Sequence, residues 1–230
     1  MSRDLILIPA RSDSSRYPNK LHTTFLGRTL LELTYRRAQR YWWTHNVVIV
    51  AGDAKIAALC DQINAPYVCV DNDGIENGTQ RCAWAFTQLK DHFEPKRVIV
   101  WQADEPQISV DLPFQKWSET EITTLVAPID VIEVADENQV KSHVYRKNNR
   151  VHWFSRHTRS RLGHVGLYCF PALFFYKCCA LPMTDNAKEE SLEQITWLEN
   201  GYTIESVCLA ENPVSINVER DWERYASATP

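Results

Sequence analysis

Short apolar runs alternate with longer segments of helical period along the first half of the chain. The runs predict strands over residues 5–8, 46–50, 67–70 and 97–101. The segments between them predict helices over 29–43, 54–63 and 79–89, the first capped by Thr29. Because runs that are apolar at every position are buried on both faces, helices are expected on both sides of a parallel sheet.

The second half of the chain is less regular. Apolar runs predict strands of a mixed sheet over 122–128, 139–145, 151–154 and 163–170. A helix over 189–199, a strand over 203–208 and a terminal helix over 220–226 follow. The polar segment 141–150 is most simply a solvated hairpin turn. Since no low-complexity linker or repeat interrupts the pattern, we expect one continuous α/β domain over residues 1–230.

Composition narrows the class of protein. The 25 basic and 29 acidic residues give a net charge of -4, which disfavours nucleic-acid binding. The apolar runs fall far short of the roughly 18 residues that a membrane span needs, and no secretion signal opens the chain. Seven cysteines without a C-x-x-C pair favour reduced thiols and a cytoplasmic location.

A loop at 9–21 follows the first predicted strand and carries three cations, Arg11, Arg16 and Lys20. Ligands of open α/β sheets bind at the carboxyl ends of strands, and these side chains suit a triphosphate. A solvated basic loop is an equally good interpretation of the composition alone. The residues match neither a P-loop nor a dinucleotide-binding glycine pattern.

The order Pro9-Ala10-Arg11, then Ser14, Arg16, Pro18 and Lys20, resembles the signature of cytidylyltransferases that activate acidic sugars. The likeness is greatest to the 3-deoxy-D-manno-octulosonate (Kdo) cytidylyltransferases, and it recurs in order along nearly the whole chain. The resemblance implies a Rossmann-like nucleotidyltransferase fold, with a mostly parallel central sheet covered by helices on both faces. It also implies a smaller mixed-sheet part for sugar binding and dimerisation.

Three further segments resemble the nucleotide side of this family: Ala51-Gly52-Asp53, Asn77-Gly78-Thr79-Gln80-Arg81 and Gln102-Ala103-Asp104-Glu105-Pro106. Asp53 alone would be a helix N-cap, the interpretation that the residue by itself favours. A bare glycine at a helix start lets a base edge approach the backbone. The nucleotide-binding residues implied by the resemblance are Ala10, Arg11, Lys20, Asp53, Gly78, Thr79, Arg81 and Gln102.

Asp104 is the strongest metal candidate, because an aspartate just past a buried strand suits Mg²⁺. The family's second metal-binding aspartate is replaced here by Asn217. An amide oxygen still coordinates Mg²⁺ but brings no charge, so metal affinity should fall unless Glu219 or Asp221 substitutes. We therefore expect Mg²⁺ to be held by Asp104, with Asn217 as a weaker ligand.

The acceptor side of the family is resembled by Gln139-Val140-Lys141, Trp153-Phe154-Ser155-Arg156, His164-Val165-Gly166-Leu167-Tyr168 and Leu192-Glu193-Gln194. The implied sugar-binding residues are Gln102, His164, Tyr168, Glu193 and Gln194. A loop that the family has after Arg156 is shorter here, and Arg159 or Arg161 is a candidate for its missing cation. The choice of acceptor is therefore less determined than the choice of nucleotide.

The resemblance implies that the protein joins CTP to Kdo or a Kdo-like 2-keto sugar acid, with release of pyrophosphate. The implied catalytic residues are Arg11, Lys20, Asp104 and Arg156, with Mg²⁺ as cofactor and a homodimer as assembly. Two alternatives stay open at this point. One is the same reaction on a sialic-acid-like or amino-Kdo acceptor, and the other is a non-catalytic relative that only binds a nucleotide or CMP-sugar.

Overall fold

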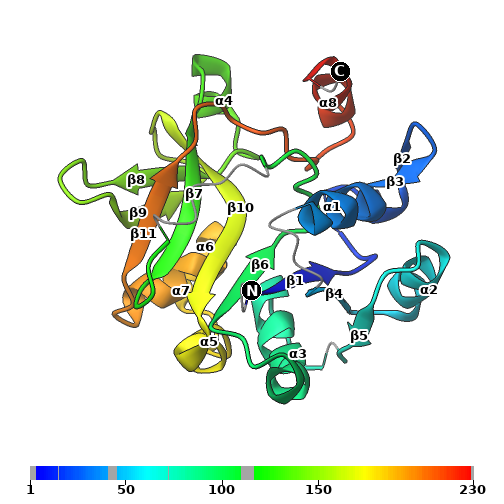
Figure 1. Cartoon of the computed structure of the whole chain (residues 1–230). Coiled ribbons are helices and arrows are strands. Elements are labelled where there is room, and N and C mark those ends of the chain that lie inside the picture. The colour runs from blue at the N-terminus through cyan, green and yellow to red at the C-terminus, as the bar shows by residue number, and fades with distance from the viewer. Residues whose placement is uncertain (1–3, 15, 41–45, 72, 110–116, 229–230) are drawn as a thin grey trace.

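The computed structural model of the chain describes residues 4–14, 16–40, 46–71, 73–109 and 117–228. Its centre is a nine-stranded sheet with strand order β5-β4-β1-β6-β10-β7-β11-β9-β8 (Figure 1). The strands are β1 (Asp4–Ala10), β4 (Val47–Ala51), β5 (Tyr67–Cys69), β6 (Arg97–Trp101), β7 (Ile122–Pro128), β8 (Lys141–Val144), β9 (Arg150–Ser155), β10 (Leu162–Pro171) and β11 (Ile204–Cys208).

The sheet is parallel on one side and mixed on the other. Strands β5, β4, β1 and β6 pair in parallel, with Ile6 opposite Val47 on one side of β1 and Ile99 on the other. Beyond β6, strand β10 runs antiparallel to both β6 and β7, whereas β11 is parallel to β7. The expected combination of a parallel part and a mixed part is therefore observed, but the mixed part, with the five strands β10, β7, β11, β9 and β8, is not smaller than the parallel part with its four.

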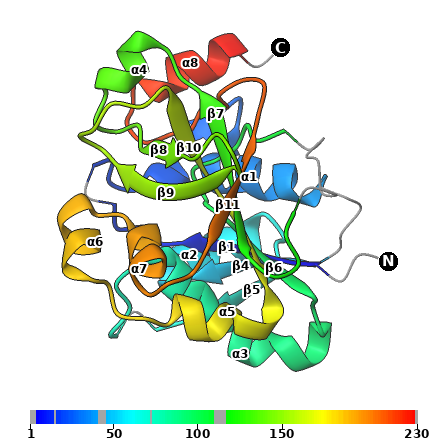
Figure 2. The ribbon, with the colours of Figure 1, turned by 90° about the vertical axis from the view of Figure 1, so that its left-hand side faces the viewer.

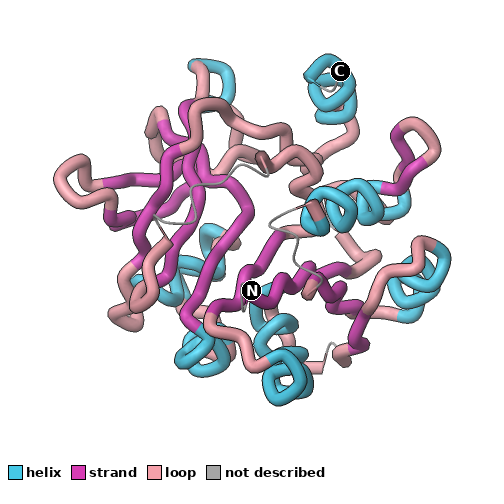
Figure 3. Tube along the Cα trace, in the orientation of Figure 1, coloured by secondary structure: helices cyan, strands magenta, loops and turns pink. Residues whose placement is uncertain are grey.

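Helices cover both faces of the sheet, as the unbroken apolar strands predict (Figure 3). Ile6 and Ile8 face α1, α2 and α8, while Leu5 and Leu7 face α3, α5, α6 and α7. The helices are α1 (Leu30–Gln39), α2 (Ala54–Gln62), α3 (Gly78–Phe93), α4 (Val131–Ala135), α5 (Ala172–Cys179), α6 (Asp185–Glu190), α7 (Glu193–Glu199) and α8 (Asp221–Ala228). The C-terminal helix α8 returns to the end of the molecule that carries α4 (Figures 1 and 2). Arg224 Nη2 on α8 lies 2.6 Å from Glu133 Oε1 on α4.

Two expected helices are wrong in their extent, and some observed elements were not expected. The helix expected over 189–199 is two short helices, α6 and α7, because Ser191 between them has a left-handed backbone with φ 55°. The first helix ends at Gln39, and residues 41–43 of the expected span lie outside the described residues. The helix α5 and the small hairpin of β2 (Thr24–Phe25) and β3 (Arg28–Thr29) were not expected.

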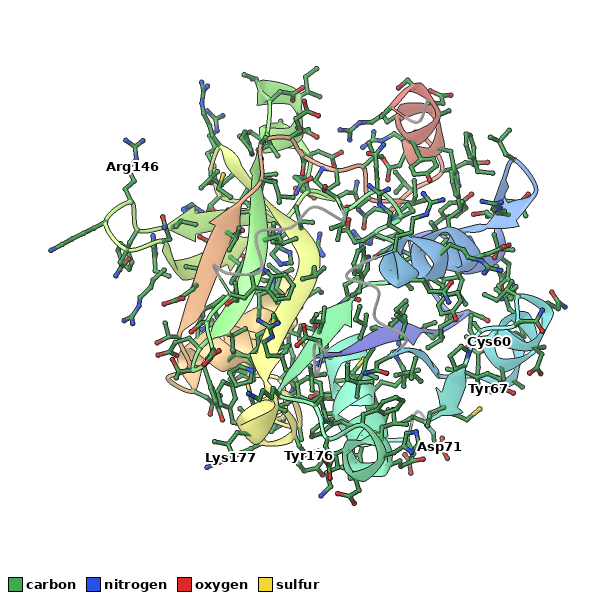
Figure 4. The ribbon with its side chains drawn as sticks, in the orientation of Figure 1. Cys60, Tyr67, Asp71, Arg146, Tyr176 and Lys177 are labelled. Atoms are coloured by element: carbon green, nitrogen blue, oxygen red, sulfur yellow. The ribbon has the colours of Figure 1, made fainter. Side chains whose placement is uncertain are left out.

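The segment 141–150 is a hairpin, but only its tip is solvated. Strands β8 and β9 pair antiparallel, and Arg146 at the tip extends away from the body of the protein (Figure 4). Lys141, in contrast, is 1% exposed and points inward. The expectation of a solvated turn is therefore wrong for the start of the segment.

Candidate active site

A cavity of about 870 Å³ opens at the carboxyl ends of β1 and β6. A smaller one of about 230 Å³ adjoins it under the loop that follows β1. Both are lined by Arg11, Arg16, Gly78, Gln102 and Asp104. Of the other predicted site residues, Arg156, His164, Tyr168, Glu193, Gln194 and Asn217 line the larger cavity, and Lys20 and Arg81 line the smaller. The structure thus gathers residues from seven distant segments around one space.

Asp53 fixes the loop after β1 to the start of α2. Its carboxylate accepts hydrogen bonds from Ser12 N at 2.7 Å and Ser12 Oγ at 2.9 Å, and it caps α2 through Ile56 N at 3.0 Å. Burial raises the pKa of Asp53, but these hydrogen bonds outweigh it and lower the pKa below the usual value. The helix-cap interpretation is confirmed, and the same carboxylate holds the loop whose cations face the cavity.

Lys20 joins three segments at the floor of the site. Its ammonium lies 2.5 Å from Asp104 Oδ2 and donates a second hydrogen bond to the carbonyl of Ile216 at 3.2 Å. Ile216 N in turn donates to the carbonyl of Asp104 at 2.9 Å. The loop after β1, the end of β6 and the C-terminal segment therefore meet at one carboxylate, beside the position that Asn217 occupies.

Asn217 receives no help from the two acidic residues considered as substitutes. Asp221 Oδ2 is engaged by Asn217 N at 2.7 Å and Val218 N at 2.9 Å, at the start of α8. Glu219 is exposed and is not among the lining residues of either cavity. The alternative that one of them substitutes for the missing carboxylate finds no support in these contacts, and Asp104 and Asn217 offer one carboxylate and one amide.

The first turn of α3 forms the wall nearest to β1. Asn77 caps the helix by accepting from Gln80 N at 2.8 Å. A Cβ on Gly78 would meet the side chain of Pro9 at 3.1 Å, so this position favours glycine where the two segments touch. Arg81 is 2% exposed, and burial lowers its pKa. The turn thus presents bare backbone to the cavity.

His164 and Tyr168 form the acceptor wall on β10. The His164 ring stacks on Tyr168, with ring centroids 5.1 Å apart, and its Nε2 lies 3.0 Å from Thr124 Oγ1. Burial, and secondarily the charge of Arg156, lower the pKa of His164 to about 3. The imidazole is therefore neutral at physiological pH, so that it offers hydrogen bonds and not a charge.

Arg156 is held through its guanidinium by main-chain carbonyls and through its own backbone N by a carboxylate. Its guanidinium donates to the carbonyls of Glu137 at 3.1 Å and Asn138 at 3.3 Å, while Arg156 N donates to Glu190 at 2.9 Å. Behind it, Lys141 Nζ donates to the carbonyls of Arg156 at 2.6 Å and Asp136 at 2.7 Å. The position of the guanidinium is thus set before any ligand binds.

A larger hollow, of about 1240 Å³, lies at the opposite end of the strands beside α3 and α5. No residue of the predicted site is among its lining residues within the described chain. Its buried charges are already satisfied, since Arg97 donates two hydrogen bonds of 2.8 Å to Asp4. We therefore place the candidate active site at the carboxyl ends of β1 and β6.

Residues 5–205 of the chain match the sequence pattern of the family described as "Cytidylyltransferase". The chain belongs to the cytidylyltransferase family. It is 34% identical to the 3-deoxy-manno-octulosonate cytidylyltransferase of Pelodictyon phaeoclathratiforme, over 96% of this chain and 94% of the relative. It is 31% identical to the enzyme of the same name from Synechococcus elongatus, over 97% of each chain. The resemblance found from the motifs is therefore confirmed.

The fold of this cytidylyltransferase also matches a solved structure, a CMP:2-keto-3-deoxy-manno-octonic acid synthetase complexed with CTP. The TM-score is 0.83 at 24% identity, and the match covers 98% of each chain. A glucose-1-phosphate thymidylyltransferase from Bacillus anthracis shares the fold at a TM-score of 0.68 and 14% identity. The expected nucleotidyltransferase fold is confirmed.

Three residues expected to bind the nucleotide lie behind the cavity wall. Ala10 and Thr79 are buried, and neither they nor Asp53 are among the lining residues of the two cavities. Their side chains position neighbours, as Asp53 does through Ser12. A direct contact of these side chains with the nucleotide stays a prediction.

The sequence motifs gave no role to Glu105. In the structure its carboxylate joins the segment after β6 to β10 and to the C-terminal segment. Its Oε1 accepts from Gly166 N at 2.9 Å and from Ser215 Oγ at 2.7 Å. A Cβ on Gly166 would lie 2.8 Å from that oxygen, so glycine is required there. Burial, and secondarily Asp104, raise the pKa of Glu105 to about 8. A signal was present, since Glu105 lies within the quoted motif, but its partners are 61 and 110 residues away.

Proposed function

We propose that the protein transfers the cytidylyl group of CTP to the anomeric hydroxyl of Kdo, giving CMP-Kdo and pyrophosphate. One observation carries the proposal. The cationic loop after β1, the Lys20–Asp104 pair and the His164–Tyr168 wall border two adjoining cavities that share five lining residues. The names of the relatives, at up to 34% identity over almost the full chain, support CTP and Kdo as its two occupants.

At phosphorus the reaction forms one P–O bond and breaks another, and the proton of the acceptor hydroxyl is released to solvent. The acceptor oxygen attacks the α-phosphorus of CTP, the bond from that phosphorus to the bridging oxygen of the β-phosphate breaks, and pyrophosphate leaves. Such a transfer depends on alignment and on neutralisation of phosphate charge. Arg11, Arg16 and Lys20 surround the smaller cavity and are the groups that would neutralise the triphosphate.

The acceptor would lie against the wall opposite the nucleotide loop. Arg156 supplies a fixed positive charge for a carboxylate or a phosphate oxygen. The neutral ring of His164 and the hydroxyl of Tyr168 orient sugar hydroxyls without adding charge. Gln102 lies between the two ends of the site and borders both cavities, which suits its proposed contacts to both substrates.

Mg²⁺ is proposed as the cofactor, and the residues present fit a single ion. Asp104 offers one carboxylate and Asn217 one amide oxygen, and Mg²⁺ commonly takes one or two carboxylates beside phosphate oxygens and water. Within the described ranges no cluster of three acidic, histidine or cysteine side chains exists to hold it without substrate. When bound, the ion would supply Lewis-acid polarisation of the phosphate oxygens.

A homodimer in the cytoplasm is the proposed state of the protein. The seven cysteines are all free, which suits a reducing compartment. None of the helices in the described ranges has both the length and the apolar composition of a membrane span. Exposed apolar side chains such as Leu173, at 98% exposure, and Trp84, at 48%, offer contact area for a second copy. A monomeric mass by light scattering at micromolar concentration would reject the dimer.

Pyrophosphate release from CTP and Mg²⁺ tests the function when a panel of 2-keto sugar acids is supplied one at a time. We expect the fastest release with Kdo. Faster release with a sialic-acid-like or amino-Kdo acceptor would assign another acceptor to the same reaction. Binding of CTP without release under any condition would favour the non-catalytic relative.

A further inference from the structure

We propose that Glu193 is a positioning residue for the nucleotide-binding turn of α3, and that it couples α7 on the acceptor side to CTP binding. The inference rests on the proposed function, because it assumes that CTP occupies the cavity. It differs from the role implied by the family resemblance, in which Glu193 contacts the sugar. The contacts of its carboxylate point to the opposite side of the site.

Both oxygens of Glu193 are engaged by the first turn of α3. Oε1 accepts from Thr79 Oγ1 at 2.5 Å, and Oε2 accepts from Thr79 N at 3.3 Å. Gln102 Nε2 adds a longer contact to Oε1 at 3.4 Å. Thr79 is 0% exposed, so water cannot replace the carboxylate on its hydroxyl. The start of α7 is thereby fastened to the start of α3, across 114 residues of sequence.

These contacts decide what can bind at this helix end. Of the first amides of α3, Thr79 N is taken by Glu193 and Gln80 N by Asn77. A phosphate that bound these two amides would have to displace Glu193 or Asn77, although helix N-termini otherwise attract anions. The group that lies against Gly78 is therefore expected to be uncharged, as a cytosine ring is. The triphosphate is directed instead toward Arg11 and Lys20.

The same contacts link the two substrates. Gln194 follows Glu193 on α7, is 2% exposed and lines the acceptor end of the cavity. A ligand that orders the turn at Gly78 and Thr79 also orders the start of α7, and with it Gln194. Because such coupling is reciprocal, CTP and the sugar acid should raise each other's affinity by the same factor.

Calorimetric titration of the full-length protein with CTP tests the proposal. Mg²⁺ is present and the sugar acid is left out. Glu193→Gln and Thr79→Val should each weaken CTP binding by about tenfold, the cost of a lost buried hydrogen bond to a carboxylate. The double variant should be about as weak as the weaker single variant, because both changes remove one interaction. Glu189→Gln, which neutralises an exposed carboxylate on α6, is the matched control and should bind CTP as the wild type does.

Each outcome bears on a different claim. Glu193→Gln that binds CTP normally, but has a raised KM for the sugar acid, would overturn the positioning role and leave the proposed function intact. Wild-type protein that does not bind CTP would overturn the proposed function itself. Thr79→Ser keeps the hydroxyl, so it keeps the proposal testable if Thr79→Val fails to fold. Binding by Thr79→Ser within about twofold of wild type supports the contact, whereas binding as weak as that of Thr79→Val overturns it.

Discussion

On the nucleotide side of the cavity, Asp104 and the loop with Arg11 and Lys20 follow two neighbouring parallel strands, β1 and β6. On the acceptor side, His164, Arg156 and Gln194 come from a mixed sheet and a short helix. Parallel strands bring their carboxyl ends together by topology alone, so short motifs after them suffice to build a site. The acceptor side needs interior side chains such as Lys141 to hold its loops in place.

The largest expected effect is on the nucleotide side, with Asp104→Asn. The variant keeps the volume but removes the carboxylate that pairs with Lys20 and would hold Mg²⁺, so turnover should fall at least roughly 100-fold. Steady-state pyrophosphate release measures it, with Asp91→Asn on the exposed face of α3 as control. Near-native turnover of Asp104→Asn would show that the metal is held elsewhere.

Much of this side could be predicted from the sequence, for physical reasons. The strands with Leu5 and Val98 are apolar at every position of 5–8 and 98–101, and the motif after each strand is contiguous. The break between α6 and α7 could not be predicted, because Ser191 adopts its left-handed backbone without a glycine to signal it. The apolar residues of α5 have helical and strand interpretations of similar quality, so nothing indicated a helix there.

On the acceptor side, the residues that line the cavity could be predicted from the sequence, but the groups that hold them in position could not. The motif around His164 identified a wall of the site, yet the partners that fix Arg156 are the main-chain carbonyls of Glu137 and Asn138 and the buried ammonium of Lys141. Such contacts join segments far apart in sequence, and a lysine in a polar stretch looks solvated. Pattern alone therefore misses groups that act from behind the cavity wall.

The second prediction separates the two sides. Lys141→Met removes the ammonium that donates to the carbonyls of Asp136 and Arg156, although the Asp136 carbonyl keeps the hydrogen bond from Gln139 N. It should raise KM for the sugar acid about tenfold and lower stability by about 2 kcal/mol. The affinity for CTP should stay unchanged in calorimetry, because Lys141 touches only the acceptor side. Lys147→Met, at the exposed hairpin tip, is the control. An equal loss of CTP affinity in Lys141→Met would contradict the division of the cavity.

A smaller effect is expected for Asn217→Asp. The change adds a carboxylate beside Asp104, and the concentration of Mg²⁺ for half-maximal turnover should drop severalfold. A magnesium titration at saturating CTP measures it. Unchanged magnesium dependence in an active enzyme would place Asn217 outside the metal shell, and activity that appears only in the variant would identify the natural protein as a binder.

The smallest effect concerns stability against pH. Because the pKa of His164 is lowered to about 3 in the fold, the unfolded chain binds its proton more readily, and His164 favours the native state above pH 6.5. That contribution is lost as pH falls toward 3. Urea unfolding gives the free energy of unfolding of the wild type and of His164→Asn. The advantage of the wild type over the variant should be about 2 kcal/mol smaller at pH 4 than at pH 7.

Phosphorus NMR of a mixture of CTP, Kdo, Mg²⁺ and the wild-type protein tests the central claim most directly. We expect the three triphosphate resonances to be replaced by pyrophosphate and one phosphodiester resonance. Omission of Kdo, or use of Asp104→Asn, should leave CTP intact. Consumption of CTP without Kdo, or CTP that binds and is never consumed with Kdo present, would contradict the assignment of this cavity as a site that joins the two.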